Sequence, residues 1–331
     1  ETSILLAHET QRPMAGLQVG DEIYGTEKRG HYRRYVRTHV LAHWRTSKPA
    51  WRVRLADGTE LIASADHRFL TERGWKFVAR EANGGQRPYL TLNNTLMGFG
   101  AISGFPGVGD SDDYRRGYLC GIIRGDGHLG EYRYTRPGRT SGDQYRFLLA
   151  MADTEALDRA AAFLSGFGIG TDRFLFQAAA STRRLMEAIR TSARASVAAI
   201  GKLIEWPERP HGEWVRGFVG GIFDAEGSFN NGTIRIANTD HRIIDVLTGA
   251  LRSLRFDPVV ETPPRGAAKP VHYVRVRGGL REHLRFLDLF DPSIARKRDI
   301  KHQAVKSTAR LEVVEVEPLG RPMELFDITT G

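Results

Sequence analysis

The pattern of glycines and apolar residues in one stretch of the chain recurs one hundred residues later. Residues 114–130 read YRRGYLCGIIRGDGHLG, and residues 214–230 read WVRGFVGGIFDAEGSFN. In both stretches the apolar residues follow helical spacing and a glycine closes the run. The matched positions are Arg116 and Arg216, Gly117 and Gly217, Gly121 and Gly221, Ile122 and Ile222, Asp126 and Glu226, and Gly127 and Gly227.

The segments after the two stretches also agree. A polar, strand-like segment comes next, and then an amphipathic pattern that predicts a helix, at 154–169 in the first copy and 241–256 in the second. We therefore predict an internal repeat, residues 110–207 and 208–303, in which each copy is an α+β unit with a helix, an antiparallel sheet and further helices.

The flanking regions have a different pattern. Residues 1–98 and 304–331 show strand-like alternation broken by Gly and Asp turns, which indicates an all-β domain made of both ends of the chain. Residues 99–109 are rich in Gly and Pro and are predicted to be a linker.

The glycines of the repeat predict a close helix pair. Gly117 and Gly121 lie four residues apart, as do Gly217 and Gly221, so each pair lies on one helix face. A glycine inside a helix costs ~1 kcal/mol relative to alanine, so these glycines need a compensating contact. We expect the two helices to pack against each other through them.

Paired helices of this kind bring two acids together. Asp126 and Glu226 stand in the last turns of the two predicted helices, where acids are unfavourable unless a cation is bound. Hard cations with oxygen ligands, above all Mg²⁺, suit such a pair. We predict a catalytic metal site of Asp126, Glu226 and the preceding Gly125 and Ala225, with Mg²⁺ as the cofactor and Mn²⁺ as a substitute. The alternative is that both acids are ordinary helix ends.

The charge balance suggests a polyanionic partner. Lys and Arg total 48 and Asp and Glu 39, for a net charge of +9. Arginines beside aromatic residues and glycines suit phosphate contact, although each cluster could also be a solvated surface. The candidate DNA-binding residues are Arg33, Arg34, Arg37, Arg133, Arg136, Arg139, Arg146, Arg235, Arg275 and Arg277.

Composition and short motifs also exclude several classes of protein and indicate the cellular compartment. Cys120 is the only cysteine, which excludes a disulfide framework and fits a cytoplasmic protein. No apolar run reaches the ~20 residues of a membrane helix, so no membrane partner is expected. Gly125, Gly127 and Gly130 satisfy G-x-G-x-x-G, but no helix is predicted after them, so a dinucleotide site is rejected.

The repeated motifs resemble those of LAGLIDADG homing endonucleases. Residues 119–127 read LCGIIRGDG and residues 219–227 read VGGIFDAEG. The resemblance implies αββαββα units that form a monomeric pseudo-dimer, with saddle-shaped sheets along the DNA major groove. It also implies that Asp126 and Glu226 bind metal and cleave both strands of duplex DNA. Arg124 departs from the family pattern, which commonly has Asp there, whereas Asp224 keeps it.

The flanks resemble the Hint domain of inteins. Residues 2–25, 55–78 and 323–329 are similar to intein splicing blocks, which implies splicing-related roles for Ser64, His67 and Asp327. The sequence has neither an initial nucleophile at Glu1 nor a final His-Asn, so splicing is not expected of the chain as written. The whole chain is most similar to inteins of bacterial radical-SAM proteins, which implies that the endonuclease cuts the intein-free junction of the host gene.

Two other functions compete with this interpretation. A maturase or transcription regulator with LAGLIDADG units would bind DNA or RNA without cutting it, but would not need both Asp126 and Glu226. A splicing element with a decayed endonuclease would be expected to lose an acid or the paired glycines. We therefore predict an active, metal-dependent endonuclease.

Overall fold

The chain forms two compact units. The computed structural model of the protein describes residues 3–7, 11–100, 111–134, 138, 142–262 and 270–331. Unit 1 comprises Glu1–Ser103 with Asp299–Gly331, and unit 2 comprises Gly104–Arg298. Unit 1 is therefore built from the two ends of the chain. Most of the predicted linker, residues 99–109, lies outside the described residues.

Strands make up the regular structure of the described part of unit 1, apart from the short 3-10 helices Met14–Gly16 and Arg80–Asn83. Its strands are β1 (Ser3–Leu5), β2 (Gln11–Pro13), β3 (Glu22–Arg29), β4 (Tyr32–Leu55), β5 (Glu60–Ser64), β6 (Arg68–Thr71), β7 (Gly74–Phe77), β8 (Thr95–Met97) and β17 (Ser307–Thr330).

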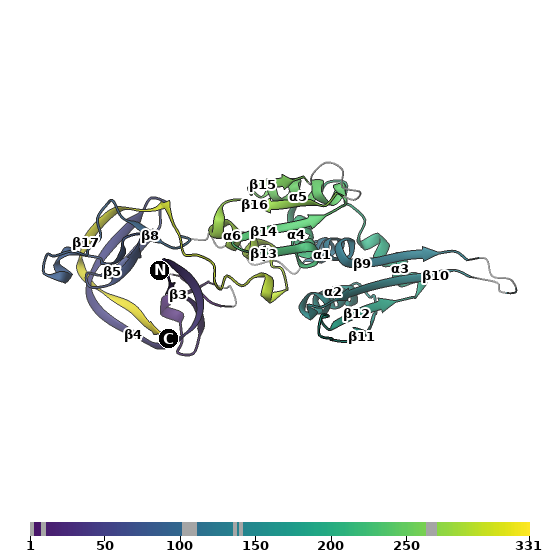
Figure 1. Cartoon of the computed structure of the whole chain (residues 1–331), viewed down its shortest axis with the longest axis horizontal. Coiled ribbons are helices and arrows are strands. Elements are labelled where there is room, and N and C mark those ends of the chain that lie inside the picture. Colours follow the sequence, from purple (N-terminus) through teal and green to yellow (C-terminus); the bar gives the residue numbers. More distant parts are fainter. Residues whose placement is uncertain (1–2, 8–10, 101–110, 135–137, 139–141, 263–269) are drawn as a thin grey trace. The chain divides into compact units, whose positions relative to one another are not determined.

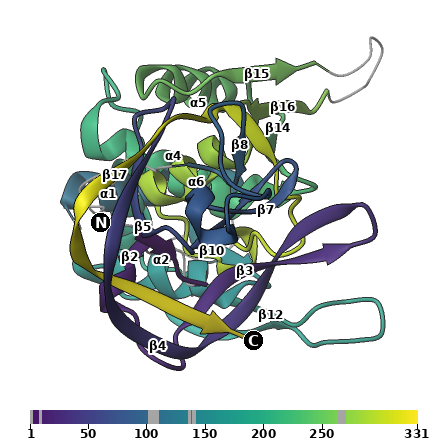
Figure 2. The ribbon, with the colours of Figure 1, turned by 90° about the vertical axis from the view of Figure 1, so that its left-hand side faces the viewer.

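Two long antiparallel strands organise unit 1. β4 and β17 each span 24 residues and pair from Leu55 opposite Val313 to Val40 opposite Thr330, with register shifts between (Figures 1 and 2). The sheet order is β3-β4-β17-β8-β6-β7, and β5 pairs with β4. The last strand of the chain therefore lies inside this sheet, between strands from its beginning.

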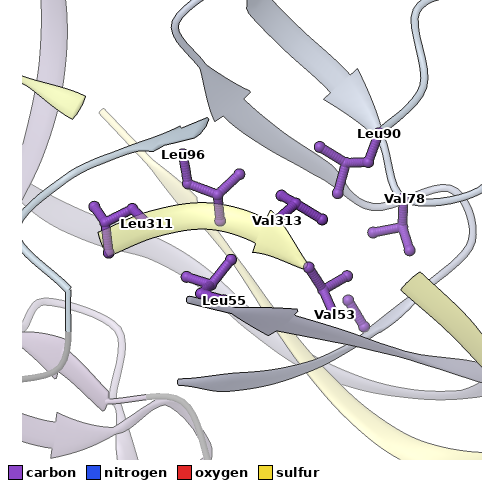
Figure 3. Close-up of a cluster of buried hydrophobic side chains, with 8 residues drawn as sticks. Val53, Leu55, Val78, Leu90, Leu96, Leu311 and Val313 are labelled. Atoms are coloured by element: carbon purple, nitrogen blue, oxygen red, sulfur yellow. The ribbon is translucent and has the colours of Figure 1, made fainter. Parts of the chain in front are cut away.

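The core of unit 1 draws on both chain segments. Figure 3 shows Val53 and Leu55 of β4 against Leu311 and Val313 of β17, with Leu96 beside them; all are at most 7% exposed. Alternate residues of these strands point to this core, as expected of half-buried strands. Burial of apolar surface here contributes about 25 cal/mol per Å², so the two chain segments stabilise each other.

Unit 2 contains the same element order twice, which confirms the predicted mixture of helices and strands. The first copy holds α1 (Asp112–Asp126), β9 (Gly127–Tyr132), β10 (Gln144–Met151), α2 (Thr154–Gly166), β11 (Asp172–Gln177), β12 (Met186–Thr191) and α3 (Arg194–Leu203). The second holds α4 (Gly212–Glu226), β13 (Gly227–Asn230), β14 (Thr233–Asn238), α5 (His241–Ser253), β15 (Pro258–Glu261), β16 (His272–Val276) and α6 (Gly279–Phe290), followed by a 3-10 turn, Ala295–Lys297.

The helices α1 and α4 begin and end at matched points. Ser111 caps α1 by accepting a hydrogen bond from the Tyr114 amide, which satisfies one of the free donors of a helix start. Both helices end where a glycine, Gly127 or Gly227, enters a strand directly. A strand and not a helix therefore follows Gly127, which agrees with the rejection of a dinucleotide site.

Each copy contributes one antiparallel sheet. The orders are β11-β12-β10-β9 and β13-β14-β16-β15. In each sheet one face packs against helices of its own copy, and α1 and α4 lie side by side (Figure 1). We call the opposite face of each sheet the outer face; it carries Arg190 in copy one and Arg235 in copy two. Among the described residues, no helix is both long and apolar enough to cross a bilayer.

Candidate functional site

Reciprocal backbone contacts hold α1 and α4 together. A Cβ atom added at each repeated glycine would lie closer than any real Cβ approaches a neighbour. The clashing atoms are carbonyl oxygens of the facing helix: 2.0 Å for Gly117 with Trp214, 2.0 Å for Gly217 with Tyr114, 2.4 Å for Gly121 with Phe218, and 2.1 Å for Gly221 with Tyr118. The structure thus places all four glycines at the helix contact.

The close approach continues to the ends of the two helices. A Cβ atom on Gly125 would lie 2.5 Å from Cβ of Ala225 and 3.3 Å from Cγ of Glu226. Because Asp126 follows Gly125 directly, its carboxylate and that of Glu226 are brought into one small region. The two acids that the sequence separates by one hundred residues are neighbours.

The electrostatics of the pair agree with this proximity. The pKa of Glu226 is raised to about 7, chiefly by burial and also by the Asp126 charge, while Lys297 opposes the shift. Burial also raises the pKa of Asp126, again against the effect of Lys297. Two half-buried carboxylates that disfavour each other's ionised form are stabilised by a cation between them.

Lys297 is part of this site, and sequence reasoning missed it. Its side chain is buried, and its Nζ donates to the carbonyl oxygens of Phe223 at 3.0 Å and Asp224 at 2.6 Å. The ammonium therefore caps the negative end of α4, whose last turn has no basic residue of its own. The absence of a basic residue from the last turn of α4 could have indicated that a cation from elsewhere caps this helix. It does not indicate which lysine or arginine supplies that charge.

Asn238, at the end of β14, was also missed. Its Nδ2 donates to Oε1 of Glu226 at 3.2 Å, and its Oδ1 accepts from the amide of Asp240 at 2.8 Å. The second bond fixes the orientation of the amide, so that its donor side faces the acid. Met151 ends β10 at the corresponding place in copy one, so the surroundings of Asp126 and Glu226 differ.

The motif difference between Arg124 and Asp224 has a structural cause. Asp224 is fully buried and accepts hydrogen bonds from the Ser293 amide at 2.7 Å and the Ile294 amide at 3.2 Å. Arg124 donates to the Ile204 carbonyl at 2.7 Å. Each residue thus anchors the segment that follows the last helix of its own copy, one as an acceptor and the other as a donor.

The arginines predicted to bind DNA in copy two share the outer face of its sheet. Ile234 and Ile236 are buried on the helix side, so Arg235 between them points outward. Arg275 lies opposite Arg235 and is on the same face. Arg277 follows with the same alternation and is exposed.

Copy one presents a comparable outer face. Arg146 is exposed there, with its guanidinium 5.5 Å from the ring centre of Tyr132. Arg190, which is not among the predicted residues, lies opposite Leu148 on that face and stacks on Phe174 at 4.5 Å. Arg133 is exposed just after β9, whereas Arg136 and Arg139 lie outside the described residues.

The three arginines predicted in unit 1 lie on the β3–β4 hairpin, drawn in purple in Figure 2. They already have partners within unit 1. Arg33 donates to Thr26, and Arg34 donates to the His302 carbonyl at 2.7 Å. Arg37 forms an ion pair with Asp299 at 3.2 Å.

The predicted splicing residues lie together in unit 1. Ser64, His67 and Asp327 line one cavity of about 320 Å³. Nδ1 of His67 lies 4.0 Å from Oδ2 of Asp327. Burial lowers the pKa of His67, and the Asp327 charge opposes that shift. A neutral imidazole beside a carboxylate is suited to orienting or moving a proton.

Comparison with known proteins identifies the class of part of unit 2. Residues 213–289 match the LAGLIDADG-like domain family. The match covers the elements of copy two from α4 into α6, so unit 2 contains a LAGLIDADG-like domain. A search of curated proteins found no match to the chain.

Several solved structures are similar to this chain. One is the homing endonuclease I-DmoI in complex with DNA and Mn, at 15% identity and a TM-score of 0.44, covering 54% of this chain and 98% of that chain. I-DmoI with DNA and Ca has 16% identity, a TM-score of 0.43, and coverage of 54% and 89%. The N-terminal LAGLIDADG domain of DUF199/WhiA has 12% identity, a TM-score of 0.40, and coverage of 55% and 83%.

Proposed function

We propose that unit 2 is a metal-dependent endonuclease that cuts both strands of duplex DNA. The observation that carries this proposal is the pairing of Asp126 and Glu226 at the ends of two helices in backbone contact. A protein that only binds nucleic acid has no need of two half-buried acids that oppose each other's ionisation. Incubation with the intein-free host-gene junction and Mg²⁺ tests the proposal directly.

The residues present fit a divalent cation. Asp126 and Glu226 offer carboxylate oxygens, with the backbone at Gly125 and Ala225 beside them, and oxygen is the ligand that Mg²⁺ and Mn²⁺ prefer. Among the described residues no cluster of three or more His, Cys, Asp or Glu forms a metal site, so DNA phosphates would supply further ligands. When bound, the ion would stabilise the attacking and leaving oxygens of the phosphodiester.

The protein's own residues have distinct tasks in this proposal. Asn238 holds the Glu226 carboxylate in place, and Lys297 supplies a fixed positive charge beside both acids. The outer-face arginines neutralise DNA phosphates and set the register of the duplex. We propose that one chain suffices, with the two copies acting as a pseudo-dimer.

The β3–β4 hairpin is proposed as a second DNA contact. Neutralising Arg33, Arg34 and Arg37 together should flatten the salt dependence of duplex binding, because each lost phosphate contact reduces the slope of log K against log salt by about 0.9. Binding titrations at several salt concentrations measure the slope. An unchanged slope would mean that the internal partners of these arginines are their only role.

We further propose that unit 1 is a splicing-type Hint domain and that the whole chain is an intein related to those of radical-SAM proteins. The supporting observation is that Ser64, His67 and Asp327 line one cavity. His67 would polarise the peptide bond to be broken.

This second proposal has its own test. In a fusion with Cys in place of Glu1 behind an added N-terminal segment, thiol should release that segment. His67→Ala should slow the release about a hundredfold, the usual size of an acid–base contribution. His31→Ala, at the tip of the hairpin, is the control. Equal release by both variants would remove His67 from the proposed chemistry.

A further inference from the structure

One carboxylate lies among the arginines on the outer face of copy two. Oε1 of Glu261 accepts a hydrogen bond from Nε of Arg275 at 2.7 Å, and its Oε2 lies 3.6 Å from Nε of Arg235. The side chain of Glu261 is 35% exposed, as against 50% for Arg235 and 30% for Arg275. A single acid thus links two arginines on a surface proposed to bind DNA.

The sheet register explains how this bridge forms. Arg235 and Arg275 face each other directly across β14 and β16, where like charges repel. Glu261 faces Tyr273, and Val259 faces Arg275, so Glu261 is diagonal to Arg275 on the same face. The Arg275 hydrogen bond holds the pKa of Glu261 below its usual range, so the carboxylate is ionised at neutral pH.

The corresponding face of copy one is arranged differently. Arg146 and Arg190 stack on the rings of Tyr132 and Phe174. Aromatic partners leave the guanidinium charge available to a phosphate, whereas a carboxylate competes with phosphate for the same donors. Glu261 therefore reduces the attraction of copy two for any duplex backbone, whatever its sequence.

We propose that Glu261 is a specificity-determining residue that weakens the binding of copy two to arbitrary DNA; this rests on the proposed DNA-cleaving function of unit 2. In a non-specific complex the carboxylate repels phosphates and keeps Arg235 and Arg275 occupied. A matching site compensates by placing a base-edge amino group against the acid, since Glu accepts hydrogen bonds from the cytosine N4 amino group.

The test uses the full chain and a short duplex of arbitrary sequence. Glu261→Gln frees two guanidinium groups for phosphate contact, and each contact steepens the slope of log K against log salt by about 0.9. When salt is raised from about 50 to about 200 mM, the variant should therefore lose about tenfold more affinity than the parent loses. At the lower salt it should also bind this duplex about tenfold more tightly than the parent. Selection from a randomised duplex pool should show a cytosine preference in the parent that the variant lacks.

A merely structural role for Glu261 predicts the opposite sign. If the acid only relieves repulsion between Arg235 and Arg275, its loss displaces them and weakens binding.

Glu187→Gln is the matched control. It removes one negative charge from the copy-one sheet at a position opposite buried Met151, where Glu187 pairs with Arg173 on the helix side. Glu261→Gln binding like the control, or more weakly than the parent, would overturn the inference. A parent that binds no duplex at all would instead refute the proposed function, and the inference with it.

Discussion

Asp126→Asn and Glu226→Gln should each abolish cleavage of at least one DNA strand while leaving duplex binding intact. Each substitution keeps the size of the side chain and removes one anionic ligand of the proposed cation. Metal stabilisation of a phosphodiester transition state is worth several kcal/mol, so cleavage should fall at least about a hundredfold. Affinity rests on phosphate contacts elsewhere and should change little.

Conversion of supercoiled plasmid to nicked and linear forms measures this effect strand by strand, with the plasmid carrying the intein-free junction. Asp245→Asn is the control, because Asp245 is an exposed acid on α5 outside the paired acids. Chelation of divalent ions should reproduce the loss in the parent. Full cleavage by both acid variants would end the metal-site assignment.

Gly121→Leu or Gly221→Leu should damage folding and cleavage together. Cβ would lie 2.4 Å from the Phe218 carbonyl oxygen in the first variant and 2.1 Å from that of Tyr118 in the second. These neighbours are backbone atoms of a packed helix and cannot rotate away, so we expect a loss of more than about 4 kcal/mol in the free energy of unfolding. Separation of the helices would also part Asp126 from Glu226.

Gly249→Leu is the matched control for these variants. Gly249 lies inside α5, and a Cβ atom there would meet nothing within 4 Å. It should be tolerated and gain about 0.8 kcal/mol of helix propensity. Thermal melts and cleavage assays of the three variants test this prediction. If Gly121→Leu or Gly221→Leu melted at the same temperature as the parent, the packing of the two helices would not depend on this contact.

The parts of the site that could be predicted from the sequence are those that lie within a short motif present in both copies. The glycine spacing and the two acids recur at a fixed interval, so both the helix contact and the proximity of Asp126 and Glu226 could be anticipated. Asn238 and Lys297 could not be. Each acts on α4 from another element, Asn238 from the end of β14 and Lys297 from the 3-10 turn after α6, and nothing in its own neighbourhood marks it as part of the site.

The basic residues show the same limit. Composition indicates that arginines are abundant but not what each one touches. Arg37 is held by Asp299 from the far end of the chain, and Glu261 occupies Arg235 and Arg275 across two strands. Which arginines stay available to the proposed DNA partner therefore depends on long-range pairing, which exists only in the folded chain.

The position of β17 has a consequence for synthesis on the ribosome. Roughly 250 residues separate the end of β4 from the start of β17, and at about 5–20 residues per second β4 waits about 12–50 s for its partner strand to emerge. Unit 2 lies wholly between β4 and β17 in the sequence, so it can fold before β17 has been made. Asp327 belongs to β17, so the cavity that holds Ser64 and His67 remains unfinished until β17 has emerged. Any peptide-bond chemistry in that cavity is thereby delayed until unit 2 has been made.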